Sequence, residues 1–163
     1  MSTLLVDPFV LDYQTYVYLA IGLGMLISLL FSETVGVMGG GIIVPGYFAM
    51  YLQDSLSVFF TFIIAYITYL IIYFLSKYLL IYGRRRVILS LLIAFLIGLI
   101  FRKGIESSFI ETSSFNVDYI GFIIPGLIAS WMDKQGVSRT ISVVLIQASL
   151  VHFILMLIYI YNV

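Results

Sequence analysis

The side chains that usually perform catalysis or bind metal ions are almost absent from this chain. Its 163 residues include no cysteine and a single histidine, His152. Within one chain, this composition excludes a disulfide, a thiolate nucleophile and a histidine cluster for zinc or iron. The sequence also has no nucleotide-binding glycine loop, no paired carboxylates at helical spacing and no Ser-His-Asp arrangement. We therefore expect no catalytic constellation, cofactor or metal ion in the chain itself.

The pattern best suited to binding is a short motif that occurs twice, 80 positions apart. Residues 41–49 read GIIVPGYFA and residues 121–129 read GFIIPGLIA, and the two align without gaps. Proline cannot donate a helical hydrogen bond, and glycine lets a ligand or another backbone approach closely. The shared Gly-x-Ile-x-Pro-Gly-x-x-Ala favours an ancestral duplication. Two unrelated kinked membrane helices are the alternative, because glycine and proline are common in such helices.

The composition indicates that these motifs lie in a membrane. Hydrophobic residues make up 63% of the chain and charged residues only 10%, whereas about 25% of the residues of a soluble domain are charged. Eight basic residues balance eight acidic ones, so the charge gives no reason to expect nucleic-acid binding. The first twelve residues contain no Lys or Arg, which favours a retained membrane anchor over a signal peptide. The sequence predicts an all-α integral membrane protein.

Four long apolar runs are expected to be transmembrane helices, because a backbone in hydrocarbon must satisfy its own hydrogen bonds. These runs cover residues 16–31, 58–80, 87–101 and 141–159. Two shorter segments, residues 41–52 and 121–132, contain the Pro-Gly motif and are too short for a straight crossing. Each short segment is either a re-entrant hairpin or a broken crossing.

The distribution of charge favours broken crossings. With six crossings, Arg84–Arg86, Lys134 and Arg139 share one side, opposite Arg102 and Lys103. With four crossings, the basic residues are split almost evenly. Because basic residues concentrate on the cytoplasmic side, six crossings fit better, with both termini outside the cytoplasm. The two copies of the motif then run in opposite directions, so residues 1–82 and 83–163 form an inverted repeat within one membrane domain, as in many secondary transporters.

The few polar residues in or beside the apolar runs each have a structural and a functional interpretation. Arg84, Arg85 and Arg86 suit a topology anchor, or a dock for a cytosolic subunit or an anionic polymer. Glu33 suits the headgroup layer, or contact with a partner or substrate. His152 could line a pathway, but an interhelical hydrogen bond is the expected role.

Small residues recur four positions apart in two of the long runs. They are Gly24, Ser28 and Ser32 in the first run, and Ser90, Ala94 and Gly98 in the third. Such stripes let membrane helices approach closely. They suit packing within the chain or contacts in a homo-oligomer.

Several motifs together give a specific resemblance. Residues 28–36 read SLLFSETVG, residues 44–47 read VPGY, residues 82–86 read YGRRR, and residues 124–129 read IPGLIA, followed by KQG at 134–136. In these motifs and their order, over almost the whole chain, the sequence resembles the PgsC/CapC family. Members of that family are small membrane subunits of the bacterial poly-γ-glutamate synthesis machinery. Residues 1–12 and 109–116 match least.

The resemblance implies a multi-pass protein of the bacterial inner membrane and a set of partners. A cytosolic ATP-dependent amide ligase of the PgsB/CapB type, similar to Mur ligases, joins glutamates through their γ-carboxyls. ATP and a metal ion are expected in that ligase. The other implied partners are further membrane-associated synthase subunits, the anionic polymer and the lipid bilayer. The family's C subunit has no well-established catalytic residues, so none is transferred.

Physics and resemblance together suggest how the chain works. Poly-γ-glutamate carries one carboxylate per residue and cannot cross hydrocarbon unaided. Helix N-termini at the two Pro-Gly breaks could present free N–H groups to it, although the breaks could equally serve tight helix packing. We expect the chain to support the ligase and help the polymer cross; a pure scaffold and an independent small-solute transporter are the alternatives. The candidate pathway or structural residues are Gly41, Pro45, Gly46, Gly121, Pro125 and Gly126, and the candidate docking residues are Glu33, Arg84, Arg85 and Arg86.

Overall fold

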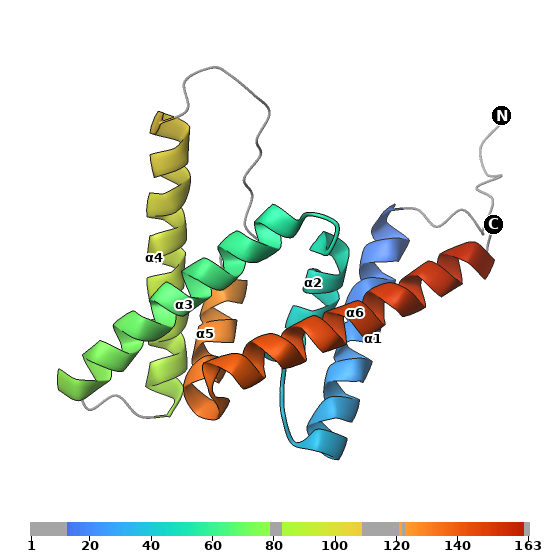
Figure 1. The fold of residues 1–163 in the computed structure, drawn as a ribbon, viewed down its shortest axis with the longest axis horizontal. Helices are drawn as coiled ribbons and strands as arrows, with labels where there is room; N and C mark the ends of the chain where they lie inside the picture. The colour runs from blue at the N-terminus through green and yellow to red at the C-terminus, as the bar shows by residue number, and fades with distance from the viewer. Residues whose placement is uncertain (1–12, 79–82, 109–120, 122, 162–163) are drawn as a thin grey trace, which may run out of the picture.

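The protein is all-helical, as its composition predicts. A computed structural model describes residues 13–78, 83–108, 121 and 123–161, and these residues contain no strand (Figure 1). The helices are α1 (Tyr13–Val35), α2 (Val44–Tyr51), α3 (Ser55–Tyr78), α4 (Arg84–Ser108), α5 (Ile124–Gln135) and α6 (Val137–Tyr161).

Three of these helices are long and apolar enough to cross a membrane. They contain the spans Gln14–Val35, Ser55–Tyr78 and Val137–Ile160, which correspond to the first, second and fourth predicted runs. The remaining run, residues 87–101, lies in α4 between charged residues at both ends. At 1.5 Å per residue its uncharged part is about 22 Å long, less than the ~30 Å of a hydrocarbon core. A fourth long transmembrane helix therefore stays a prediction.

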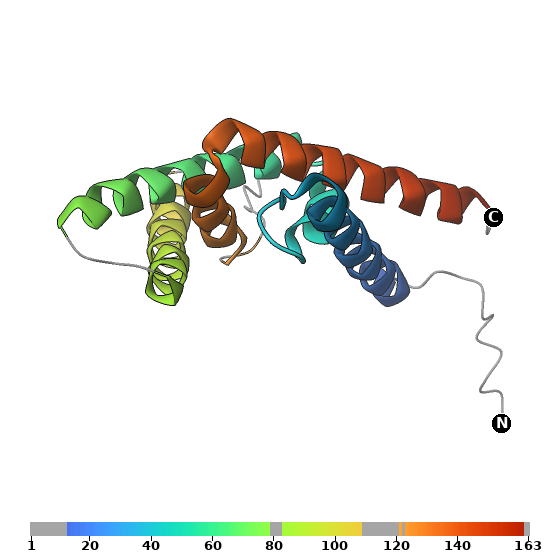
Figure 2. The same ribbon diagram turned by 90° about the horizontal axis from the view of Figure 1, so that it is seen from below.

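The helices pack as two groups of three. α2 lies against α1 and α6, whereas α5 lies against α4 and α3 (Figure 1). Each group therefore combines two helices from one half of the chain with the last helix of the other half. Figure 2 shows α3 and α6 along one side of the molecule, covering the other four helices. This exchange ties the two halves of the chain into one unit.

Corresponding helices of the two halves run in opposite directions. In Figure 1, α1 runs downward and α4 upward, α2 runs upward and α5 downward, and α3 and α6 point to opposite sides. Both α3 and α6 have a buried face. Thr61, Ala65 and Thr68 are buried on α3, and Val144, Ala148 and Val151 are buried on α6.

The small-residue stripes form the inner faces of α1 and α4. Gly24 and Ser28 are buried on α1 together with Ala20, whereas Ser32 is only half-buried; Ser90, Ala94 and Gly98 are buried on α4. Each stripe lies against the short helix of its own half. The predicted close helix packing is confirmed, and within the chain it joins α1 to α2 and α4 to α5.

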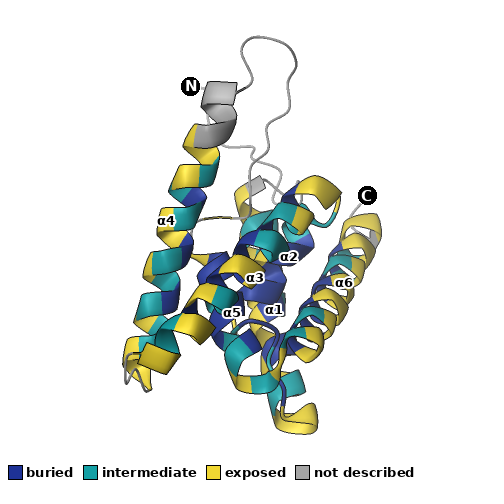
Figure 3. Cartoon of the chain, turned by 60° about the vertical axis from the view of Figure 1, so that its left-hand side comes forward, coloured by how far each residue is buried: buried dark blue, intermediate teal, exposed yellow. Residues whose placement is uncertain are grey.

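The core surrounds α2 and α5, whereas the outer faces of the long helices are apolar and exposed. Phe48 and Ile128, from the two short helices, are fully buried in one cluster with Val144 of α6. Figure 3 shows buried residues gathered in this central region and exposed residues on the outward sides. Ile88 and Phe153 are 63% and 60% exposed. Such apolar surface is compatible with lipid tails, which are as apolar as these side chains.

Basic residues gather at one end of the molecule. The C-terminal ends of α1, α3 and α5 and the N-terminal ends of α4 and α6 all point to the lower side of Figure 1. We call this side the basic end. Of the eight Lys and Arg residues, it carries Lys77, Arg84, Arg85, Arg86, Lys134 and Arg139, whereas Arg102 and Lys103 lie towards the other end of α4.

Candidate functional site

Each Pro-Gly motif begins a short helix. Pro45 and Pro125 lie in the first turn of α2 and α5, where a missing N–H costs no hydrogen bond and the fixed φ of proline suits the helix. The two short apolar segments are therefore not helices interrupted at their middle. In the first segment, residues 36–43 are non-helical and α2 follows them, and in the second segment α5 begins at Ile124.

The first turns of α2 and α5 carry helical N–H groups without a side-chain cap. Neither N-cap residue, Ile43 or Ile123, is capped by a side-chain hydrogen bond. The first hydrogen bonds of these turns run from Tyr47 N to Ile43 O (3.4 Å) and from Leu127 N to Ile123 O (3.1 Å). Uncapped amides at a helix start carry a partial positive charge. Both breaks therefore present the positive end of a helix.

One pocket joins the two helix starts. It has a volume of about 290 Å³ and is lined by Ile43, Val44 and Tyr47 from the first half of the chain, and by Gly121, Ile123, Ile124 and Leu127 from the second. We call it the central pocket. Among the residues that the structure describes, its lining contains no charged side chain, so none of these residues neutralises the helix dipoles there. Ile43 and Ile123 are 44% and 60% exposed, so the pocket is accessible from the surface of a single chain.

The glycines of the motif have two separate roles. Gly41 and Gly121 precede the helices with φ of 117° and 60°, conformations that favour glycine. Gly46 and Gly126 are buried against the long helices: a Cβ on Gly46 would lie 2.6 Å from Ala20 O, and one on Gly126 would lie 2.8 Å from Leu91 Cα. Gly46 and Gly126 therefore serve close packing, while residues next to them line the central pocket.

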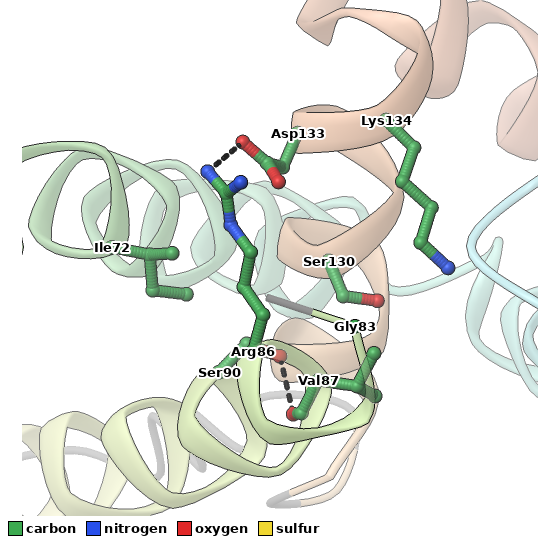
Figure 4. A pocket seen from close by; sticks show the side chains of 8 residues that line it. All are labelled: Ile72, Gly83, Arg86, Val87, Ser90, Ser130, Asp133 and Lys134. Carbon is green, nitrogen blue, oxygen red and sulfur yellow. Dashed lines mark hydrogen bonds and ion pairs between the residues drawn. The ribbon is translucent and has the colours of Figure 1, made fainter. Parts of the chain in front are cut away.

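The three arginines of the basic end have different surroundings. Arg84 and Arg85 are exposed. Arg86 turns inward, and its Nη2 atom lies 2.5 Å from Oδ1 of Asp133 near the end of α5 (Figure 4). Its Nε atom is buried and has no hydrogen-bond partner among the described residues. The sequence grouped these arginines as one dock, but the structure pairs Arg86 with Asp133, which the sequence analysis did not select.

A second pocket lies beside this ion pair. Its volume is about 170 Å³, and its lining residues from α4 and α5 include Arg86, Ser90, Ser130, Asp133 and Lys134 (Figure 4). We call it the Arg86 pocket. Ser90 Oγ donates to Val87 O (2.6 Å) and Ser130 Oγ donates to Leu127 O (2.8 Å). Because both hydroxyl protons are used within their own helices, the two oxygens can act only as acceptors towards a ligand.

Glu33 lies in neither pocket, and His152 has a structural partner. Glu33 is exposed near the end of α1 and forms no ion pair within the described part of the chain, so its docking role stays a prediction. His152 Nδ1 lies 3.1 Å from the backbone oxygen of Ala49. The expected interhelical hydrogen bond is confirmed, and it joins α6 to α2.

Gln135 fixes the segment that leads into α2. Its Nε2 donates to Met38 O (2.5 Å), and its Oε1 accepts from Met38 N (3.3 Å). Nε2 also donates to Thr140 Oγ1 (3.1 Å) at the start of α6. Gln135 belongs to the KQG motif that carried the family resemblance, but no local pattern indicated a partner 97 residues away. This side chain attaches the non-helical part of the first break to the α5–α6 junction.

Comparison with known proteins identifies relatives of this chain. The family model described as "Capsule biosynthesis CapC" matches residues 23–141. The chain is 34% identical over 124 residues to the "PGA biosynthesis protein CapC" of Bacillus subtilis (strain 168), a match covering 76% of this chain and 82% of the relative. It is also 34% identical over 125 residues to the "Capsule biosynthesis protein CapC" of Bacillus anthracis, covering 76% and 83%. No solved structure matches the chain.

Proposed function

Because the chain belongs to the capsule biosynthesis CapC family, we propose that it is a membrane subunit of the machinery that makes and exports poly-γ-glutamate. The family and the two relatives imply a role in capsule or PGA biosynthesis. In our proposal the chain supports a cytosolic PgsB/CapB-type amide ligase and helps the polymer cross the bacterial inner membrane. ATP and a metal ion act in that ligase, and other membrane-associated subunits or a second copy of the chain complete the assembly.

We propose six crossings, two of which contain the short helices α2 and α5. Six of the eight basic residues share the basic end, which is therefore the cytoplasmic end by the positive-inside rule. The opposite directions of corresponding helices support an inverted repeat of residues 1–82 and 83–163. An ancestral duplication explains this arrangement together with the shared motif.

The observation that carries the export role is the meeting of two uncapped helix starts at the central pocket. The polymer is an anion that hydrocarbon excludes. Positive helix ends attract a carboxylate without adding a fixed counter-charge that would trap it. We therefore propose that carboxylates of the polymer pass the central pocket one after another.

The basic end is the proposed dock for the ligase. Arg84 and Arg85 are exposed there, and Glu33 lies exposed at the same end. Exposed charges at an interface increase the rate of association and select the partner. The ligase would then release polymer on the side from which the chain takes it.

Reconstitution into sealed vesicles tests the proposal against its alternatives. Ligase, ATP and glutamate are added outside vesicles that contain this chain with its basic end outward, and lumenal polymer is the part protected from a polymer-degrading hydrolase. We expect polymer synthesis to increase and polymer to accumulate in the lumen. A pure scaffold would increase synthesis but leave all the polymer outside, and an independent transporter would move glutamate without ligase. Synthesis and accumulation that do not depend on this chain would overturn the proposal.

A further inference from the structure

The charges around the Arg86 pocket do not balance. Arg86 and Lys134 line it together with one carboxylate, that of Asp133. α4 begins beside the pocket with three consecutive arginines, although the positive end of a helix dipole disfavours cations there. The pocket therefore has an excess of positive charge and favours an anionic ligand.

Arg86 also has unused capacity to bind a carboxylate. A guanidinium presents five N–H donors in a planar fork. Asp133 occupies only Nη2, while Nε is buried without a partner among the described residues. Carboxylates bind such a fork best when they accept two parallel hydrogen bonds. A ligand carboxylate that accepted hydrogen bonds from two nitrogens of Arg86 would therefore bind it more strongly than Asp133, which contacts Nη2 alone.

The other lining groups limit what kind of anion fits. Ser130 offers an acceptor oxygen, which suits a ligand that also carries an N–H group, whereas Ser90 is fully buried. The volume of about 170 Å³ is roughly the volume that six water molecules occupy in the liquid. That volume suits one amino-acid unit and excludes a folded segment of polymer.

We infer that the Arg86 pocket binds a single glutamate unit, whose carboxylate displaces Asp133 from Arg86 and whose N–H donates to Ser130. The lining of the occupied pocket then has two carboxylates and two cations, Arg86 and Lys134, although Lys134 Nζ lies over the Trp131 ring (4.5 Å) and points away from Arg86 (Figure 4). This inference rests on the proposed function and names the unit of the polymer that is recognised at the cytoplasmic end. Free glutamate and a γ-linked unit share this chemistry, so the experiment must separate them.

The test is ligand binding to the full chain in lipid nanodiscs, measured by titration calorimetry. The probes are free glutamate, a γ-linked glutamate tetramer, and the same tetramer with its α-carboxyls amidated. We expect the tetramer to bind at least about tenfold more tightly than its amidated form. Tighter binding of the tetramer than of free glutamate identifies the polymer as the ligand, and the reverse identifies the monomer. Equal binding of both tetramers would overturn the inference.

Two substitutions with opposite expected effects distinguish a binding role from a structural one. Arg86→Gln should weaken tetramer binding about tenfold or more, whereas Asp133→Asn should strengthen it several-fold because the competing carboxylate is gone. Arg139→Gln removes the same charge from an exposed position of the basic end and should change binding less than about twofold. If Asp133→Asn weakens binding as Arg86→Gln does, the ion pair is structural and the inference fails.

The binding assay uses neither ligase nor transport, so its failure is separable from that of the proposed function. Absent tetramer binding, with polymer still accumulating in vesicles because of this chain, overturns the pocket alone. Intact binding without any effect on synthesis or accumulation overturns the proposed function alone.

Discussion

Gly24 of α1 and Gly46 of α2 lie backbone against backbone. A Cβ on Gly24 would lie within 2.5 Å of both the Cα and the N atom of Gly46. In the other half of the chain, Gly126 of α5 packs in the same way against Ser90 and Leu91 of α4. These contacts fix each short helix to the long helix that precedes it, and so determine where the two helix starts lie.

Alanine at Gly46 or Gly126 should destabilise the protein by about 1–3 kcal/mol, because the added methyl group meets backbone atoms that cannot move aside easily. The free energy of unfolding in detergent, followed by circular dichroism during a denaturant titration, measures this effect. Gly22→Ala is the matched control, since nothing lies within 4 Å of its Cβ position. It should be neutral or stabilising by up to about 1 kcal/mol. Equal losses at Gly22 and Gly46 would contradict the packing role.

Loss of the Gln135 side chain should loosen residues 36–43. Gln135→Ala removes its two hydrogen bonds to the backbone of Met38, with an expected cost of about 1–3 kcal/mol because partly buried groups lose their partners. Hydrogen exchange of residues 36–43 should become faster. Gln53→Ala alters an exposed glutamine between α2 and α3 and should leave that exchange unchanged. Unchanged exchange in the Gln135 variant would show that other contacts hold the segment.

The absence of cysteine from the chain allows a direct test of topology. Single cysteines at Thr34 and Ser138, both exposed, should react with a membrane-impermeant reagent from the cytoplasmic side. Cysteines at Ser55 and Lys103, also exposed, should react from the outer side. The pair Thr34 and Ser55 is decisive, because they flank the first break. Labelling of both from one side would mean that this segment re-enters instead of crossing.

Arg85→Gln should lower the amount of ligase that co-purifies with the chain several-fold at low salt. In our proposal the exposed charge of Arg85 contributes to docking. Salt weakens the attraction between exposed charges, which at 0.1 M decays over a distance of about 10 Å. The difference between the variant and the unmodified chain should therefore shrink at high salt. Lys103→Gln, at the opposite end of α4, should have no effect. Equal effects of the two substitutions would indicate that overall charge, and not the basic end, controls association.

The sequence was informative where local patterns decide the structure. The apolar runs predicted the positions of α1, α3 and α6, and the stripe through Gly24 and Ser28 predicted a closely packed helix face. The Pro-Gly pairs indicated breaks within helices. Because the first turn of a helix accepts proline without loss of a hydrogen bond, these pairs instead mark the points where α2 and α5 begin. The charged residues around residues 87–101 explain why the third predicted run is less suited to cross than the others.

Contacts between distant segments could not be predicted in this way. Helical spacing relates residues three or four positions apart, so it says nothing about which element Arg86 faces. Its partner Asp133 is 47 positions away, and Met38 lies 97 positions from Gln135. The packing of α3 and α6 on the opposite halves depends on the same kind of contact. The Arg86 pocket therefore became visible only in three dimensions.

The central claim is that two uncapped helix starts attract the polymer, and aspartate at their N-cap positions tests it most directly. Ile43 and Ile123 both line the central pocket, so Ile43→Asp and Ile123→Asp would place a negative charge at each helix start. The matching asparagine variants have nearly the same size and polarity without that charge. In the vesicle assay, the combined aspartate variant should lower lumenal polymer about tenfold or more relative to the combined asparagine variant, with synthesis outside unchanged. Equal accumulation in the two variants would contradict the claim.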